Sequence, residues 1–195
     1  MKKSYNNLHE NRPGCALMYL LAHAGITLGV ARVVEAAVKR PFFRLDYRFI
    51  LLGSLLPDIV DKPLGRIIFG AVIANGRIFL HTLIFLVMTI LLGLFIYRWK
   101  NSLWGFCIAF GVLMHLVMDA MWMDPITLFW PFISPTFGKG PGIAFLDIVR
   151  SWLHTLLVEP RVFLPELAGL AILLIFMVRV IKEKRVRAFI TTGYL

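Results

Sequence analysis

The chain has 195 residues, of which 59% are hydrophobic and 16% charged, and its formal net charge is +10. With a mean hydropathy of +0.78, this composition excludes an ordinary soluble domain and indicates an integral membrane protein. The basic residues mostly fall in short segments between apolar runs. That pattern is typical of cytoplasmic loops in contact with anionic membrane lipid, so we expect no nucleic-acid partner. The length fits a single membrane-embedded domain, residues 1–195.

The first apolar run, Leu17–Val38, follows a basic and polar N-terminus. The run is long, contains His23, and shows no convincing small-residue cleavage site, which favours a span over a cleaved signal peptide. The two cysteines, Cys15 and Cys107, are far apart and lie in or beside apolar runs. We interpret them as small core residues rather than as a disulfide or metal clip.

Four further segments complete the expected bundle. Tyr47–Val60 is short and ends in Pro57-Asp58, which predicts a short or half-buried helix packed among the others. Three later runs are long enough to cross a bilayer: Ile78–Tyr97, Leu103–Met123 and Val162–Ile181. The sequence therefore predicts an all-α fold, an integral membrane helical bundle of about five spans.

The segment 143–158 has a different pattern. Its polar residues are spaced by three, four and seven, which places them on one helical face; they are Asp147, Arg150, Ser151 and His154. Apolar residues cover the rest of the surface. This pattern predicts an interfacial amphipathic helix lying along the membrane rather than a further span.

Charge distribution predicts the topology. Arg98 and Lys100 crowd a short loop between two spans, and the C-terminal tail is also basic, so both belong in the cytoplasm by the positive-inside rule. The ionisable groups within four of the predicted helices then fall at one depth on the opposite side. In the inverted orientation, which the basic residues Lys62, Arg66 and Arg77 leave open, the groups still share one depth but face the cytoplasm. Chance scattering would rarely produce that convergence, which predicts a functional site there.

His115 and Asp119 are the most informative pair in this set. They lie four residues apart in the apolar run Leu103–Met123, and residues at that spacing share one face of a helix. Ionisable groups at such depth are costly and usually mark a site or a water-filled cavity. An imidazole and a carboxylate one turn apart can chelate a divalent metal.

Three histidines and three aspartates converge in this way: His23, Asp58, Asp61, His81, His115 and Asp119. Each alone has a plainer interpretation, as a hydrogen-bonded packing histidine or as a carboxylate that caps a helix end. Together, imidazole and carboxylate ligands suit one or two ions of Zn²⁺, Mn²⁺ or Fe²⁺, with zinc expected first. Helix bundles commonly carry such sites in their cores.

The order of these motifs resembles a known family, the membrane-bound metal-dependent hydrolases, also described as LexA-binding, inner-membrane-associated hydrolases. The resemblance covers about residues 20–135. Residues 53–61 look like its GS-x-x-PD-x-x-D segment, residues 77–82 are similar to its HRG-x-[ST]-HS motif, and His115 with Asp119 matches its H-x-x-x-D. Its early histidine corresponds to His23, and residues 124–132 resemble its segment leading into L-x-WPF.

This resemblance implies a metal-dependent hydrolase in the inner membrane. The same motif order is also similar to bacterial zinc-dependent phospholipase C, which implies a lipid or another small phosphoester as substrate. One departure stands out. Gly76 replaces the first His of the family's HRG, and Ile78 replaces its Gly. If that histidine takes part in the family's chemistry, this chain has lost a ligand or uses another residue in its place.

Within such a hydrolase, Asp58 or Asp61 is a candidate metal ligand or general base. Arg77 lies four residues before His81, so on a continuous helix it shares that face and offers a guanidinium to a phosphate. The alternative for Arg77 is a snorkelling interfacial arginine. Arg150 and His154 are candidates for binding a lipid head group, against the plainer interpretation of an interfacial polar face.

Two other classes of function remain open at this stage. The cluster suits a transporter that binds a metal ion or relays protons, and it also suits a non-catalytic membrane protein with a decayed site. A transporter needs a polar path to both faces, whereas Phe85–Phe95 and Leu103–Gly111 contain no ionisable residue. That contrast favours a one-sided site and hence the hydrolase.

Overall fold

The computed structural model describes residues 20–38, 44–139 and 145–194, and across these ranges the chain is helical without strands. Its longer helices are α1 (Leu20–Val38), α2 (Tyr47–Pro63), α3 (Leu83–Lys100), α4 (Trp104–Met118), α6 (Phe145–Val158) and α7 (Pro160–Lys182). Shorter elements are the π-helix η2 (Leu64–Ile68), the 3-10 helix η3 (Met121–Met123), α5 (Pro125–Leu128) and α8 (Val186–Thr192). The predicted all-α class is confirmed.

Three helices, α1, α3 and α7, are long and apolar enough to cross a membrane, and α4 is a shorter apolar helix of 15 residues. Large apolar side chains along α3 and α7 are exposed, Val87 and Leu91 among them. Exposed apolar surface of this extent is tolerated where lipid replaces water. The chain is therefore a multi-pass membrane protein.

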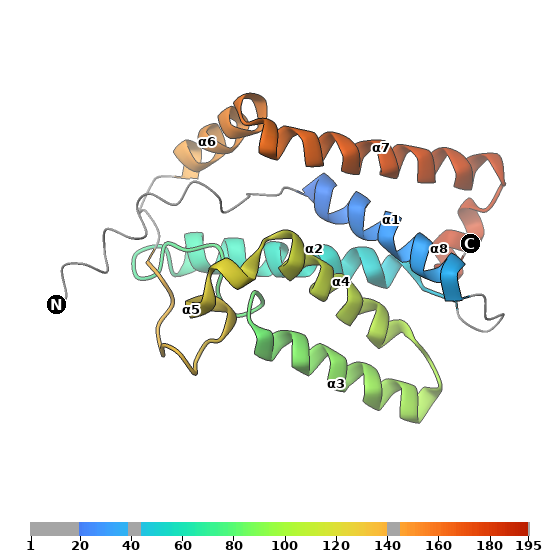
Figure 1. Ribbon diagram of the computed structural model, residues 1–195, viewed down its shortest axis with the longest axis horizontal. Helices are drawn as coiled ribbons and strands as arrows, with labels where there is room; N and C mark the ends of the chain where they lie inside the picture. Colours follow the sequence, from blue (N-terminus) through green and yellow to red (C-terminus); the bar gives the residue numbers. More distant parts are fainter. Residues whose placement is uncertain (1–19, 39–43, 140–144, 195) are drawn as a thin grey trace.

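The helices pack as a row in which α2 and α4 are central. Helix α7 packs on α1, α1 on α2, α2 on α4, and α4 on α3. Figure 1 shows α1, α3 and α7 running in one direction and α2 and α4 in the other. The loops that follow α2 and α4 therefore emerge at the same end of the bundle.

Two glycines let α2 and α4 approach closely. A Cβ atom on Gly53 would lie 2.3 Å from the carbonyl oxygen of Ile108, and one on Gly111 would lie 2.4 Å from the carbonyl oxygen of Ile50. Small residues at a crossing allow backbones to touch, which is a common way to pack helices in membranes. This crossing brings the backbone of Ser54 next to His115.

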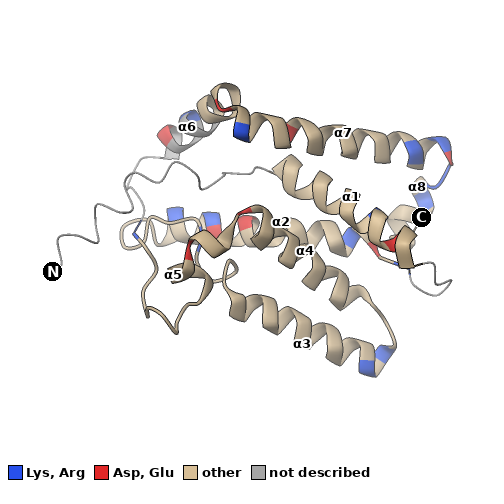
Figure 2. Ribbon diagram, viewed as in Figure 1, with Lys and Arg blue, Asp and Glu red and all other residues tan. Residues whose placement is uncertain are grey.

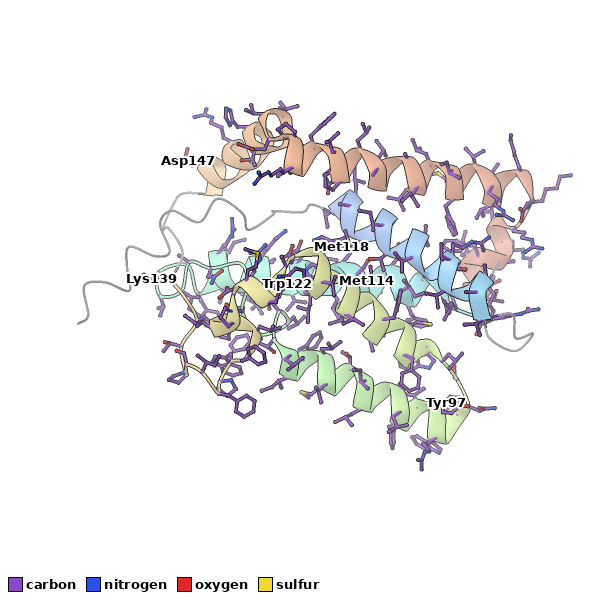
Figure 3. The ribbon with its side chains drawn as sticks, in the orientation of Figure 1. Tyr97, Met114, Met118, Trp122, Lys139 and Asp147 are labelled. Atoms are coloured by element: carbon purple, nitrogen blue, oxygen red, sulfur yellow. The ribbon has the colours of Figure 1, made fainter. Side chains whose placement is uncertain are left out.

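The two ends of the bundle differ in charge. Figure 2 shows Lys and Arg where α3 ends and α4 begins, and again where α7 ends. The opposite end combines carboxylates with a smaller group of basic residues at the end of α2. In Figure 3, Tyr97 marks the first end, whereas Trp122, Lys139 and Asp147 lie toward the other.

The helix boundaries correct three sequence-based predictions. Helix α3 begins at Leu83, not Ile78, because the side chain of Thr82 caps it by accepting the N–H of Phe85. Helix α4 ends at Met118, with Asp119 as its C-cap and Ala120 left-handed. Helix α2 does not end at Pro57-Asp58 but continues to Pro63.

Helix α6 confirms that the predicted amphipathic segment is helical from Phe145; residues 143–144 lie outside the described ranges. Asp147, Arg150 and His154 are exposed on it, and the helix packs against α7. Its placement along the membrane surface stays a prediction.

A compact apolar core lies between the two polar ends. It comprises Leu28 and Ala31 of α1, Tyr47 and Ile50 of α2, and Cys107 of α4, all at most 1% exposed. Cys107 is therefore a core residue, as predicted; Cys15 lies outside the described ranges. This core separates the His/Asp end from the basic end.

Candidate metal centre

Five of the six predicted ligands come together at one end of the bundle. Two overlapping groups have ligand atoms within 4.8 Å of one another: His23, His115 and Asp119 form one, and Asp58, His81 and His115 form the other. All five side chains are buried, at most 4% exposed. They come from four different segments: α1, α2, the loop before α3 and the end of α4. The structure therefore brings these five ionisable side chains together, as the sequence predicted.

His115 is held by its other ring nitrogen. Its Nδ1 lies 2.7 Å from the carbonyl oxygen of Ser54. A carbonyl can only accept, so Nδ1 carries the hydrogen and Nε2 of the neutral ring presents a lone pair. The close α2–α4 crossing at Gly53 and Gly111 makes this contact possible. A ring N–H on a backbone carbonyl is the usual support of a metal-binding histidine.

His81 is held in the same manner by Asp61. The Nδ1 of His81 lies 2.7 Å from Oδ2 of Asp61, and the same oxygen accepts the backbone N–H groups of Ile78, Leu80 and His81. One carboxylate oxygen thus fixes both the loop and the ring. Nε2 of His81 is therefore directed into the cluster.

The two Nε2 atoms of His81 and His115 face each other at 3.2 Å. When both rings are neutral and protonated at Nδ1, neither Nε2 has a hydrogen to donate, whereas a protonated His81 would donate one from its Nε2. Ligand nitrogens on a tetrahedral zinc, at about 2.0–2.1 Å from the metal, would be separated by roughly 3.3–3.4 Å. The observed 3.2 Å therefore lies close to the spacing of two nitrogen ligands on one ion.

The carboxylates complete this arrangement. Oδ1 of Asp58 lies 3.6 Å from Nε2 of His81 and 3.9 Å from Nε2 of His115. Asp119 places Oδ2 3.7 Å from Nε2 of His81 and Oδ1 3.3 Å from Nε2 of His23. Asp119 thus contacts one histidine of each group, His23 through Oδ1 and His81 through Oδ2.

His23 is the clearest unsatisfied group. Its ring is fully buried and stacks on His115 at 4.1 Å between centroids, yet neither of its nitrogens makes a hydrogen bond. The 3.3 Å approach to Asp119 falls within ion-pair distance without satisfying hydrogen-bond geometry. Buried polar atoms without a partner are rare and call for an explanation. An imidazole that awaits a metal supplies one, so the residues fit such an ion.

Electrostatics favour a positive charge at this point. Burial lowers the pKa of His81, but contacts with Asp58 and Asp61 more than offset it, so its pKa is raised above the ordinary value. A cation among the carboxylates is stabilised for the same Coulombic reason.

Asp61 does not join the ligand groups, contrary to the sequence prediction. Its Oδ2 is occupied by the loop and by His81, and its Oδ1 is buried without a hydrogen-bond partner. The sequence placed Asp61 correctly near the site but could not show that it supports His81 instead of facing the cluster.

Arg77 reaches the cluster by a different route from the predicted one. It lies in the loop before α3, so the expected shared helical face with His81 is wrong. Its Nε instead donates to Oδ2 of Asp119 at 2.8 Å, across 42 residues of sequence. Arg150 and His154 lie on α6, which packs on α7, and His154 belongs to neither ligand group.

Sequence reasoning missed Lys62. Its Nζ lies 2.5 Å from Oδ2 of Asp58, and the spacing of four on one helix was a usable signal. A Cβ on Gly76 would lie 3.2 Å from Cγ of Lys62 and 2.8 Å from Nε of Arg66. These two basic side chains thus fill the space next to the position that carries a histidine in the resembling family.

Glu166 of α7 was also missed as a structural group. Its carboxylate accepts the backbone N–H groups of Leu21 and Ala22 at 3.2 and 3.0 Å, which caps the start of α1 from a neighbouring helix. It is only 6% exposed. An ionisable residue inside an otherwise apolar run was the available signal.

The fold and the site together define a multi-pass membrane protein with a buried His/Asp cluster near one end of its bundle. A family model described as "YdjM inner membrane protein" matches residues 18–186. The chain therefore belongs to the YdjM inner membrane protein family and is an inner-membrane protein. Comparison with curated proteins and with solved structures gave no significant match.

Proposed function

We propose that this protein is a membrane-bound, metal-dependent hydrolase that acts on a phosphoester, in a lipid or in a smaller molecule. The observation that carries the proposal is the pair of converging Nε2 atoms of His81 and His115, each ring held by a hydrogen bond at Nδ1. A metal-binding histidine is usually held in this way at its other ring nitrogen, and two histidines that only filled the core would not need their Nε2 atoms directed at one point.

In this proposal, Asp58, His81 and His115 hold the ion, and Asp119 and His23 complete its surroundings. A bound divalent ion supplies Lewis-acid polarisation and lowers the pKa of water. Asp61 is a positioning residue, because it orients His81 and the loop before α3. This replaces the expectation that Asp61 acts as ligand or base.

Basic residues at the same end favour an anionic substrate. Arg77 and Lys62 contact the two carboxylates, Asp119 and Asp58 respectively. A metal ion that neutralises these carboxylates would weaken both contacts and leave the cations to interact with a phosphoryl group. The position of these two cations, each next to a carboxylate of the cluster, therefore supports a phosphoester as the substrate over a neutral ester.

The arrangement argues against the transporter alternative. The described parts of α3 and α4 between the site and the basic end carry no Asp, Glu, Lys, Arg or His from Leu83 to Ile96 or from Trp104 to Met114. The apolar core around Leu28 and Ile50 fills the space between α1, α2 and α4. A polar path for ions through the bundle is thus not supported.

The test has two parts. Metal analysis of purified wild-type protein should find bound zinc, manganese or iron that is lost in His115→Ala. Purified protein is then given phospholipids and soluble phosphoesters with Zn²⁺ or Mn²⁺ present. Asp119→Asn should abolish turnover with the helical content unchanged, because Asn keeps the shape but loses the anionic ligand.

Three results would contradict the proposal. Metal-dependent flux into liposomes without hydrolysis would favour the transporter. Equal metal content in wild type and His115→Ala would mean that the cluster is structural. Full hydrolytic activity in Asp119→Asn would place catalysis elsewhere.

A further inference from the structure

An apolar groove lies next to the His/Asp cluster, where α3 begins. Its volume is about 270 Å³, slightly below the range of roughly 300–1,000 Å³ for small-molecule pockets. All its lining residues are apolar: Leu83, Ile84, Val87 and Met88 of α3 on one side, and Leu128, Phe129, Trp130 and Phe132 on the other. It offers a bound molecule van der Waals contact and no polar partner.

The groove is connected to the site by the loop that carries His81. Leu83, in its wall, is two residues after His81, and Thr82 between them caps α3. On the other wall, Trp130 packs edge-on against Phe79 of the same loop, with 5.6 Å between centroids. A molecule in the groove would thus lie beside the segment that positions a proposed ligand.

The groove also continues the lipid-facing surface of the bundle. Val87 and Met88 are 46% and 61% exposed, and Leu91, one turn further along α3, is 58% exposed. In a membrane these side chains meet acyl chains. A groove in such a surface is therefore open to lipid from the side.

Charge at this end completes the argument. The segment from the end of α2 to the start of α3 carries Lys62, Arg66 and Arg77, and Figure 2 shows basic residues gathered at the end of α2. Arg77 and Lys62 contact Asp119 and Asp58 of the cluster, so cations at this end of the bundle together with the apolar groove complement a molecule with an acyl chain and an anionic head. Neither a neutral lipid nor a soluble anion would use both features.

We infer that the groove holds one acyl chain of a membrane lipid whose anionic phosphate head group is directed to the His/Asp cluster. The inference deepens the proposed function and rests on it for the chemistry, since it names an acylated phosphoester as the substrate class. The binding itself needs no turnover.

The test uses a phosphatidic acid with a photoreactive diazirine on one acyl chain. Full-length protein is reconstituted in phosphatidylcholine vesicles containing a small fraction of this probe, and labelled peptides are mapped after illumination. We expect saturable labelling of residues 83–88 and 128–132, lost on adding unlabelled phosphatidic acid. The reference is 163–170 of α7, where Phe163, Leu164 and Leu167 are likewise exposed and apolar.

Matched variants separate the groove from ordinary contact with bulk lipid. Val87→Trp fills the groove and should reduce labelling there to the level of 163–170. Leu91→Trp, on the same helix and equally exposed to lipid, should leave it unchanged. Met88→Trp is a second groove variant in case Val87→Trp does not fold, and it should act like Val87→Trp.

Each remaining result has one meaning. Labelling that is equal on α3 and α7, or insensitive to both groove variants, would overturn the inference. Equal labelling by a diacylglycerol probe, which lacks the phosphate, would refute the part of the inference that requires an anionic head group. Disulfide-linked dimers through Val87→Cys would assign the groove to a second copy instead.

Two results separate the inference from the proposed function. The expected labelling without any hydrolysis would refute the proposed function alone. Hydrolysis of soluble phosphoesters without labelling of the groove would refute this inference alone.

Discussion

A buried polar cluster and a partly buried one lie at opposite ends of α1 and α2, and they differ in how many of their polar atoms have hydrogen-bond partners. At the basic end, Glu35 accepts from the hydroxyl of Tyr47 and from the N–H of Leu45. Asp46 accepts from the backbone and the guanidinium of Arg48. Each carboxylate there has donors, which is the pattern of a structural network.

The His/Asp end is different. The Nε2 atoms of His81 and His115, which are acceptors in the neutral rings, face each other. Both nitrogens of His23 lack hydrogen-bond partners. A cluster that only stabilised the fold would be expected to match donors with acceptors. The comparison teaches that the site end holds its groups in place for a ligand, whereas the basic end uses its groups to join helices.

The largest effect should follow loss of a proposed ligand. His81→Ala should weaken zinc binding by more than about 100-fold, since removing even an outer support costs about 10–100-fold. The measurement is a zinc titration of detergent-purified protein against a chelating indicator. Glu35→Gln, at the basic end, is the control and should bind zinc as wild type does. Similar losses in both variants would erase the distinction between the two clusters.

A smaller loss should follow Asp61→Asn. The amide is neutral and supports the N–H groups of the loop and of His81 less strongly, so zinc affinity should fall by about 10–100-fold. Asp124→Asn is the matched control, because Asp124 caps the short helix α5 and lies outside both ligand groups. Unchanged zinc affinity in Asp61→Asn would refute the positioning role.

The α2–α4 crossing supports the site end mechanically. A Cβ on Gly111 would lie 2.6 Å from the backbone nitrogen of Ser54, so Gly111→Ala should lower the free energy of unfolding by about 1–3 kcal/mol. Zinc affinity should fall with it. Gly29→Ala is the control, since its Cβ would meet Ile172 at 3.4 Å, an ordinary contact. Thermal unfolding in detergent checks both, and equal midpoints would contradict the expected clash.

The smallest effects, on the stability of the metal-free protein, should differ between the two ends. Tyr47→Phe removes a hydrogen bond to the half-buried carboxylate of Glu35 and should destabilise the metal-free protein by about 1–2 kcal/mol. His23→Phe removes two buried nitrogens without hydrogen-bond partners and should leave metal-free stability equal or higher. Thermal unfolding with a chelator present measures both. Destabilisation by His23→Phe equal to that by Tyr47→Phe would mean that His23 is a structural residue.

Much of the fold was predictable because it depends on local pattern. Long apolar runs predict helices in a bilayer, and they located α1, α3, α4 and α7 to within a few residues. The spacing of His115 and Asp119 predicted their shared face, and both joined the cluster. The polar spacing in 145–158 likewise predicted a helix.

The helix ends were not predictable from hydropathy, since capping groups decide them. Thr82 ends the loop before α3, and Ala120 in the left-handed region follows the end of α4. Hydrophobicity continues through both points, so the apolar runs were longer than the helices. For that reason the sequence placed Arg77 and His81 on one helix, whereas the chain has them in a loop.

By itself, then, the sequence determined which residues lie at the polar end of the bundle, because helix periodicity and membrane depth are properties of short segments. Only the tertiary structure decided what each residue does there. Asp61 supports His81, Arg77 contacts Asp119, and the carbonyl of Ser54 orients His115. These roles depend on contacts across 20, 42 and 61 residues, and the last of them forms where α2 and α4 touch at Gly53 and Gly111.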